Sequence, residues 1–385
     1  MTSLRDPPVY CVANCEKYTW GMDYVVLEIE FVDGIVWIMW LRMRDCKDSY
    51  TADALKVVRM DSEVATLQYL HKYTSIPVPN IISYSTSPKS NPLGADPPLF
   101  MIMMPIVGCK LCDVGIDLHI PSTYDGKQLK ALQNFMMQLA TIHLELSRVT
   151  FPTIGSLYNG PDGEGFIIGP CSHTGQGPFS TVMEYVDSCA KSFIHAAQSQ
   201  PDDSEMEQKQ RLFVTSTWQN VVHSLIDPHD NAGPFPLHHP DIHDENVIID
   251  VDRNIISIFD WDAASTVPME VFAMPSIQVT NFMPSSPSDP VEHTKHMIFN
   301  DALHTMEGFL SLPLPPSSRS YNELHDSLAS YVIFFIACWM WSMKCDYDYV
   351  GWSLFIAIYP DADIDDVFKK WLQFHNDESA PNVQG

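Results

Sequence analysis

One segment of the chain gathers three histidines and six carboxylates within 24 residues. It runs from His238 to Trp261 and reads HHPDIHDENVIIDVDRNIISIFDW. Its two apolar runs, VII and IISIF, predict strands joined by a polar turn, and pairing of such strands would bring Asp241 and Asn246 beside Asp260. Carboxylate and amide oxygens are hard ligands of the kind that Mg²⁺ prefers. A carboxylate left off the metal could orient and deprotonate a hydroxyl group.

Two other interpretations of the segment compete with a magnesium site. His239, Asp241 and His243 stand two residues apart and resemble part of a two-histidine, one-carboxylate site for a transition metal. That site would need a third ligand from elsewhere in the chain, and none stands out. The segment could also be an acidic surface turn with incidental histidines, but such turns seldom place polar residues in so ordered a series. Order and spacing favour a site for magnesium and phosphate.

Composition excludes several partners and sets a size. The 385 residues suit one large domain or two lobes, and 45% of them are hydrophobic, as in globular proteins. With 22 basic and 48 acidic residues, the net charge of −26 repels nucleic acid and anionic lipid, so we expect neither as a partner. Nine cysteines at irregular spacing and no visible secretory signal predict a reducing, cytoplasmic compartment. The longest apolar run, Tyr331–Met343, is too short to span a bilayer and predicts a buried helix.

The first hundred residues are rich in β-strand patterns. Two β-rich runs, Tyr24–Val32 and Ile35–Met43, flank Asp33-Gly34, which predicts a hairpin with a two-residue loop. Apolar residues at helical spacing predict a helix over Ser62–Tyr73, with its first serine as the N-cap. The apolar run Leu99–Pro105 predicts a further strand.

The remainder of the chain is mainly helical in pattern. We expect a small hairpin around Pro161-Asp162-Gly163, and long helices over Gln128–Val149, Val182–Ser199 and Met206–Leu225. The layout predicts an α+β protein with a small β-rich N-lobe over residues 1–104 and a larger, mainly helical C-lobe over residues 105–375. Residues 376–385 read as a disordered tail.

The ordered series of polar residues resembles a known catalytic segment. His239-Pro240-Asp241, then Asn246 and Asp260-Trp261, is similar to the catalytic segment of the aminoglycoside phosphotransferase and choline kinase group. The first hairpin, the strand LFMIMMPIVGCKL and the stretch FPTIGSLYNGPDGEGFIIGP also resemble that group, its fungal members in particular. The resemblance covers roughly residues 10 to 375. It implies the bilobal protein-kinase-like fold, with a five-stranded sheet and one helix in the N-lobe.

The resemblance also implies an activity and its cofactors. The chain would be an ATP- and Mg²⁺-dependent kinase that phosphorylates a hydroxyl group of a small molecule, in secondary metabolism or self-resistance. Asp241 would be the base that orients the acceptor hydroxyl, and Asn246 and Asp260 would hold Mg²⁺ against the phosphates. His239 would be structural, buttressing the loop and the metal-binding segment. The charge of −26 would suit a cationic acceptor.

The nucleotide would bind on the N-lobe side. By the same resemblance, Glu63 would pair with a basic residue on the third strand, and the backbone around Met104 and Ile106 would bind adenine. The family expects Lys or Arg where this chain has Trp40. Arg42 shares the face of Trp40 on an extended strand, so we expect it to replace the missing base and pair with Glu63, with the indole packing against the helix. The departure leaves an alternative function, a non-catalytic kinase-fold protein (pseudokinase) that binds a ligand or partner without transferring phosphate.

Overall fold

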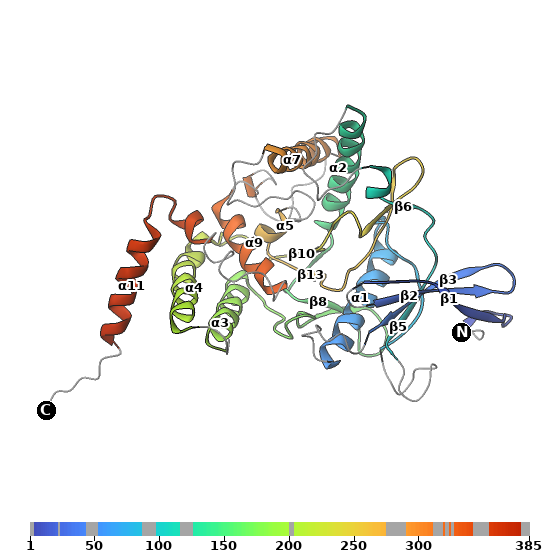
Figure 1. The fold of residues 1–385 in the computed structure, drawn as a ribbon, viewed down its shortest axis with the longest axis horizontal. Helices are drawn as coiled ribbons and strands as arrows, with labels where there is room; N and C mark the ends of the chain where they lie inside the picture. Colours follow the sequence, from blue (N-terminus) through green and yellow to red (C-terminus); the bar gives the residue numbers. More distant parts are fainter. Residues whose placement is uncertain are drawn as a thin grey trace.

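The chain forms two lobes of different composition. The structure, a computed structural model, describes residues 4–21, 24–43, 53–86, 98–115, 126–199, 204–274, 290–310, 319, 323–324, 327–341 and 354–378. Strands from the first hundred residues gather on one side of the molecule, and helices from the rest lie on the other (Figure 1). The mixed α+β architecture with two lobes agrees with the expectation from the sequence.

The N-lobe is built on one antiparallel sheet of five strands. Their spatial order is β1-β2-β3-β5-β4, so β3 lies at the centre and β1 forms an edge. Ile29, Trp37, Met39 and Ile102 form a buried cluster on one face of this sheet. The strands are β1 (Cys11–Trp20), β2 (Tyr24–Phe31), β3 (Val36–Arg42), β4 (Ile81–Ser85) and β5 (Phe100–Met103).

The loop between β2 and β3 sets which residues face one another. The Gly34 N–H donates to the Phe31 carbonyl at 2.9 Å, and the Phe31 N–H donates to the Ile35 carbonyl at 2.9 Å. Gly34 has a φ of 85°, so the loop is a three-residue turn with a bulge rather than the expected two-residue turn. The extra residue shifts the predicted register by one position, and Arg42 lies opposite Tyr24.

Helix α1 (Asp53–Tyr73) begins earlier than its apolar periodicity predicts. The expected start at Ser62 is wrong, because this residue is fully buried in the middle of the helix. The segment DALKVVRM before it is rich in good helix formers, which extends the helix toward the N-terminus. Lys56 therefore lies on α1 rather than in an irregular connection.

Helix α1 belongs to the hydrophobic cores of both lobes. Met60 and Val64, in its first part, pack with residues of the sheet. Leu67 and Leu70, further along, belong to the large core of the C-lobe. Just after the helix, the Pro77 carbonyl accepts a hydrogen bond at 2.9 Å from a C-lobe strand. The helix is thus a shared element through which the two lobes are packed together.

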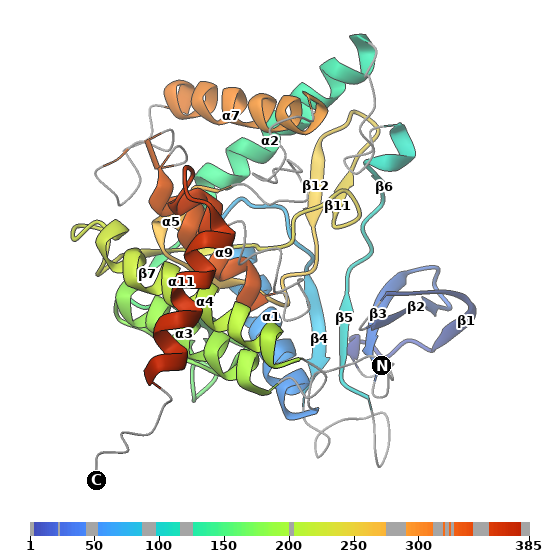
Figure 2. The same cartoon turned by 60° about the vertical axis from the view of Figure 1, so that its left-hand side comes forward.

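Within the described residues, the C-lobe surrounds its core with helices and three small β-sheets. Helix α2 packs against α7, and α3 packs against α4 (Figure 2). The hairpin predicted around Pro161-Asp162-Gly163 is confirmed as β8 and β9. The helix predicted over Tyr331–Met343 is confirmed as α9 up to Trp341, and most of its described side chains are buried; residues 342 and 343 lie outside the described residues. The helices are α2 (Gly126–Leu146), α3 (Val182–Ser199), α4 (Glu205–Leu225), α5 (Met269–Phe272), α7 (Pro290–Leu310), α9 (Leu328–Trp341) and α11 (Ile364–Glu378), with a 3₁₀ turn, η2, at Cys112–Val114. The strands are β6 (Cys109–Lys110), β7 (Thr150–Phe151), β8 (Ser156–Asn159), β9 (Phe166–Gly169), β10 (Phe235–His238), β11 (Val247–Ile249), β12 (Ile255–Ile258) and β13 (Ser265–Thr266).

Two further observations concern the end of the chain and its apolar helices. Helix α11 continues to Glu378, into the stretch expected to be a disordered tail, and residues 379–385 lie outside the described residues. Within the described ranges, no helix combines the length and apolar character needed to cross a bilayer.

A buried histidine packs in the core of the C-lobe. The His143 ring stacks on Phe272 with ring centroids 4.2 Å apart and is only 9% exposed. Burial lowers the pKa of His143 from 6.5 to about 4, although a hydrogen bond with the Phe272 backbone opposes the shift. The folded protein therefore holds this ring neutral at pH values where the unfolded chain would protonate it.

We predict that His143→Leu makes stability less sensitive to acid. Because the folded-state pKa lies below the unfolded value, His143 lowers the free energy of unfolding as pH falls from about 6.5 to about 4, by roughly 3 kcal/mol in all. The variant should show a flatter dependence of Tm on pH in this window by calorimetry. His71→Leu, at an exposed position of α1, is the control and should keep the wild-type slope. Equal slopes for all three proteins would contradict the prediction.

Candidate active site at the lobe junction

His239 fixes the loop between β10 and β11 to the strand that leads to Asp260. Its Nδ1 accepts a hydrogen bond from the Asp241 N–H at 3.1 Å, so its Nε2 carries the proton and donates to the Phe259 carbonyl at 2.8 Å. Burial lowers the pKa of His239 to about 4, which keeps the ring neutral. The ring also meets Trp261 edge-on at 4.6 Å. These contacts are those of a structural buttress, as the sequence led us to expect.

Asn246 lies between the other two predicted oxygen donors. Its side-chain Nδ2 donates to the Asp241 carbonyl at 3.0 Å. Its own carbonyl accepts from the Phe259 N–H at 2.8 Å, directly before Asp260. Pairing of β11 with β12 makes this arrangement possible, because it brings Val247 opposite Ile258. The structure thus brings the backbones of Asp241, Asn246 and Asp260 together at one end of the hairpin.

Asp260 turns the chain sharply out of β12. Its φ of 59° lies in the left-handed region, which residues other than glycine seldom adopt and Asp tolerates better than most. The next residue, Trp261, is fully buried and its Nε1 donates to the Ile258 carbonyl at 2.9 Å. The indole anchors the turn in the C-lobe core. The backbone from which the Asp260 carboxylate projects is therefore fixed.

Arg42 is buried at the junction rather than exposed at the end of a strand. Its Nη1 donates to the Tyr24 hydroxyl at 3.0 Å, and that hydroxyl donates to Glu63 Oε2 at 3.0 Å. Its Nη2 lies 3.3 Å from Asp262 Oδ2. The expected direct pair between Arg42 and Glu63 is therefore wrong. The one-residue shift in register places Tyr24 opposite Arg42, and its hydroxyl bridges the guanidinium group of Arg42 and the carboxyl group of Glu63.

Arg59 and Asp262 are residues of the junction that the sequence analysis missed. Arg59 Nε donates to Asp262 Oδ1 at 3.1 Å, and its Nη2 contacts the second carboxylate oxygen. With Arg42, two guanidinium groups of the N-lobe hold one carboxylate that is only 4% exposed. The available signal was weak: Arg59 precedes Glu63 by one helical turn, and Asp262 closely follows Asp260-Trp261.

The carboxyl group of Glu63 lies in an unusual electrostatic environment. The pKa of Glu63 is raised from 4.5 to about 8, chiefly by burial and also by the charges of Asp262 and Asp260, against the opposing effects of Arg42 and of the Tyr24 hydrogen bond. Glu63 therefore binds a proton far more readily than an exposed glutamate does. The Tyr24 hydroxyl beside it is fully buried, and burial raises its pKa well above 10. The carboxyl group that both Arg42 and Arg59 contact directly is that of Asp262 rather than that of Glu63.

Trp40 fills space between the sheet and the segment that precedes Asp260. Its indole lies 5.2 Å from the Tyr24 ring and 6.1 Å from the Phe259 ring, measured between centroids. It also packs against the cluster that contains Met60 and Val64 of α1, as expected. The indole makes apolar contacts with α1 and with the residue that follows β12.

The connection from β5 to β6 offers few free hydrogen-bonding groups. The Met104 N–H donates to the Asn80 carbonyl at 3.0 Å, so Met104 can offer only its own carbonyl to a ligand. Pro105 has no N–H. Among the hydrogen bonds between described residues, none uses the Ile106 N–H. The Ile106 N–H and the Met104 carbonyl thus remain as a donor and an acceptor in the segment expected to bind adenine.

Gly108 lets this connection approach the β11–β12 hairpin closely. A Cβ at this position would lie 2.5 Å from Ile248 Cγ2 and 2.5 Å from the Ile249 carbonyl oxygen. β6 then pairs with β11, and the chain from β5 to β6 runs in an extended path along one side of the molecule (Figure 2). The connection between the lobes is thus anchored on the same hairpin that carries Asn246.

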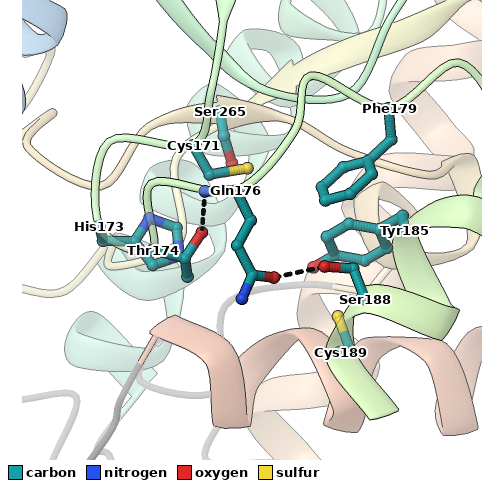
Figure 3. Close-up of a pocket in the computed structure, with 9 residues that line it drawn as sticks. All are labelled: Cys171, His173, Thr174, Gln176, Phe179, Tyr185, Ser188, Cys189 and Ser265. Carbon is teal, nitrogen blue, oxygen red and sulfur yellow. Dashed lines mark hydrogen bonds between the residues drawn. The ribbon is translucent and has the colours of Figure 1, made fainter. Parts of the chain in front are cut away.

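A small recess adjoins the segment that carries Asp262. Ser172 Oγ donates to the Asp262 carbonyl at 3.3 Å, and the next residue, His173, borders the recess. The Gln176 side chain extends across it to Ser188, with the rings of Phe179 and Tyr185 along one wall (Figure 3). Its free volume of about 10 Å³ has room for about one water molecule. An organic acceptor would therefore have to bind outside this recess.

Solved structures with the same overall fold are small-molecule kinases. A putative fructosamine-3-kinase from Thermobifida fusca is 14% identical with a TM-score of 0.50, and the match covers 91% of this chain and 93% of that one. Plasmodium vivax ethanolamine kinase is 11% identical with a TM-score of 0.52 over 89% of this chain and 81% of its own. The chain has the bilobal protein-kinase-like fold. At these identities the likeness shows the fold alone.

Curated relatives come from fungal gene clusters. A subtelomeric hrmA-associated cluster protein of Aspergillus fumigatus is 24% identical over 269 residues, which cover 54% of this chain and 50% of the relative. Clavilactone A biosynthesis cluster protein Y of Ampulloclitocybe clavipes is 26% identical over 270 residues, 63% of this chain and 59% of the relative. The chain thus spans between half and three fifths of the length of these relatives. No family model matches the chain.

We predict that Tyr24→Phe destabilises the fold although it removes a single oxygen atom. The change leaves Arg42 Nη1 and the Glu63 carboxyl group buried without the hydroxyl that bridges them, which should cost about 1–3 kcal/mol. Urea denaturation measures the free energy of unfolding. Tyr18→Phe, on the exposed edge strand, is the matched control and should change it by less than about 0.5 kcal/mol. Equal effects of the two changes would show that the bridge contributes nothing.

Proposed function

We propose that the protein is an ATP- and Mg²⁺-dependent kinase that transfers a phosphoryl group to a hydroxyl group of a small molecule. One observation carries the proposal. Asn246 is hydrogen-bonded on one side to Asp241 and on the other to the residue before Asp260, so a base candidate and two metal-ligand candidates share one end of the β11–β12 hairpin. The protein-kinase-like fold and its small-molecule kinase neighbours support this proposal.

The side chains at this end of the hairpin fit a magnesium ion. The Asn246 Nδ2 is already used by the Asp241 carbonyl, which leaves the amide oxygen for a cation. The carboxylate of Asp260 emerges from a backbone held in the left-handed conformation. Both are hard oxygen donors, as Mg²⁺ requires. When bound, the metal would neutralise charge on the transferring phosphates.

Asp241 is suited to act on the acceptor hydroxyl. Its side chain is 44% exposed, and Oδ2 lies 3.8 Å from His243 Nε2. The backbone of the loop is fixed by His239 and Asn246, so the carboxylate is presented from a rigid support. We assign Asp241 the role of general base, which orients the hydroxyl and accepts its proton as phosphate is transferred.

Nucleotide binding would use both sides of the junction. Arg42 is the cation that we assign to the phosphates in place of the residue replaced by Trp40, and Glu63 fixes it through Tyr24. The Met104 carbonyl and the Ile106 N–H would bind adenine. The −26 net charge favours a cationic acceptor, and the clavilactone cluster relative supports a role in secondary metabolism.

One observation favours a second function, a kinase-fold protein that does not transfer phosphate. The Trp40 indole occupies the expected place of a phosphate-binding cation, and the side chain of Arg42 is only 1% exposed and already paired with Asp262. Such a protein would bind a ligand or partner through the same junction without catalysis. Nucleotide binding separates the two functions.

We predict that Asp241→Asn lowers phosphotransfer at least about 100-fold while preserving the affinity for Mg·ATP, because only the base is lost. Asn246→Ala and Asp260→Asn should instead weaken Mg²⁺-dependent ATP binding about 10-fold or more. Calorimetry with ATP and Mg²⁺ gives the affinities. Turnover is measured by release of ADP with a panel of amino alcohols, sugars and phenols as acceptors.

Asp252→Asn provides the matched control on the same hairpin. Asp252 is exposed in the turn far from Asp241, so its loss should leave binding and turnover at wild-type values. Absence of ATP binding by the wild-type protein at millimolar nucleotide would reject the kinase and favour the non-catalytic function. Binding without turnover of any acceptor, with Asp241→Asn indistinguishable from wild type, would also count against a catalytic Asp241.

A further inference from the structure

In the segment 260–262, two neighbouring side chains are held by different lobes. Trp261 is anchored in the C-lobe through its hydrogen bond to the Ile258 carbonyl and its contact with His239. Asp262 is anchored in the N-lobe through Arg42 on β3 and Arg59 on α1. Asp260 immediately precedes these two anchors.

The backbone of Asp260 needs such support. A non-glycine residue with a φ of 59° is disfavoured, and it persists only where surrounding contacts over-determine the conformation. Phe259, on one side, is hydrogen-bonded to His239 and Asn246 of the C-lobe. On the other side, support comes from Trp261 and from the Asp262 carboxylate, whose two cationic partners both belong to the N-lobe.

Contacts with the N-lobe fix both oxygens of the Asp262 carboxylate. Both oxygens of the carboxylate contact Arg59, and one also contacts Arg42. The carboxylate is buried, so removal of either arginine leaves it with a single cationic partner where water solvates a charge poorly. Arg42 is itself fixed by the Tyr24 hydroxyl. The position of the N-lobe is therefore coupled to the backbone that carries Asp260.

We propose that Arg59 and Asp262 are positioning residues: by clamping the N-lobe onto the segment after Asp260, they hold the Asp260 carboxylate in the orientation that binds the metal ion. The metal-binding part rests on the proposed function, whereas the coupling between the lobes and this segment does not. Neither residue needs to touch the nucleotide or the acceptor. Arg59 acts through Asp262, and Asp262 acts through the backbone.

The test compares Arg59→Gln, Asp262→Asn and the double variant. Hydrogen exchange by mass spectrometry over residues 255–266 measures the order of the segment, and titration with Mn²⁺, followed by the EPR signal of the free ion with ADP present, measures metal affinity. We expect each single change to speed exchange over this segment and to weaken Mn²⁺ binding about 10-fold. The double variant should exchange no faster and bind Mn²⁺ no more weakly than Asp262→Asn, because the two changes remove the same interaction.

Two further variants make the result specific. Arg59→Lys keeps a cation and should recover part of the lost Mn²⁺ affinity. Arg5→Gln removes the N-lobe pair with Asp33, which spans 2.7 Å at the hairpin loop, and should leave both measurements at wild-type values. Circular dichroism establishes that each variant is folded. Should Asp262→Asn fail to fold, Arg59→Gln, whose side chain is 19% exposed, carries the test.

The outcomes separate this inference from the proposed function. A wild-type protein that binds no Mn²⁺ would reject the metal site, and the exchange data would still test the clamp. Wild-type exchange over residues 255–266 in a folded Asp262→Asn or Arg59→Gln variant would overturn the clamp. Faster exchange with unchanged Mn²⁺ affinity would overturn the positioning role.

Discussion

A buried carboxylate between the lobes must have its charge neutralised, and the arrangement of the junction follows from this requirement. Asp262 is 4% exposed, and an unpaired charge at that depth would destabilise the fold strongly. Its partners come from β3 and from α1, so the sheet and the helix of the N-lobe are both tied to the segment after β12. The three-residue loop at Gly34 matters for the same reason, because it sets the register of β3.

The β11–β12 hairpin could be predicted from sequence because its geometry is local. Two short apolar runs, separated by a polar turn, dictate antiparallel pairing, and pairing alone brings Asn246 beside the residue before Asp260. The buttressing histidine lies in the same segment. Contacts between residues so close in the chain follow from strand periodicity and turn chemistry, which a sequence displays directly. The roles of Asp241, Asn246 and Asp260 in metal binding and catalysis stay predictions.

The junction could not be predicted, because its partners are distant in sequence and its details depend on small shifts. Arg59 and Asp262 are separated by 203 residues, and no periodicity links them. A single bulge residue changed the partner of Arg42, which turned an expected ion pair with Glu63 into a bridge through a tyrosine. The start of α1 was missed because helix propensity, rather than apolar spacing, extends it.

The sharing of α1 between two cores has a consequence for synthesis of the chain. The apolar side chains of its second part, such as Leu67 and Leu70, find their partners in segments made much later. At typical rates of translation, the 203 residues between Arg59 and Asp262 take about 10 to 40 s to appear. During that interval the emerging N-terminal segment exposes the apolar face of α1, and Arg59 lacks the carboxylate of Asp262 that it contacts in the folded protein. Until the C-lobe is complete, this apolar face is exposed surface of the kind that promotes aggregation.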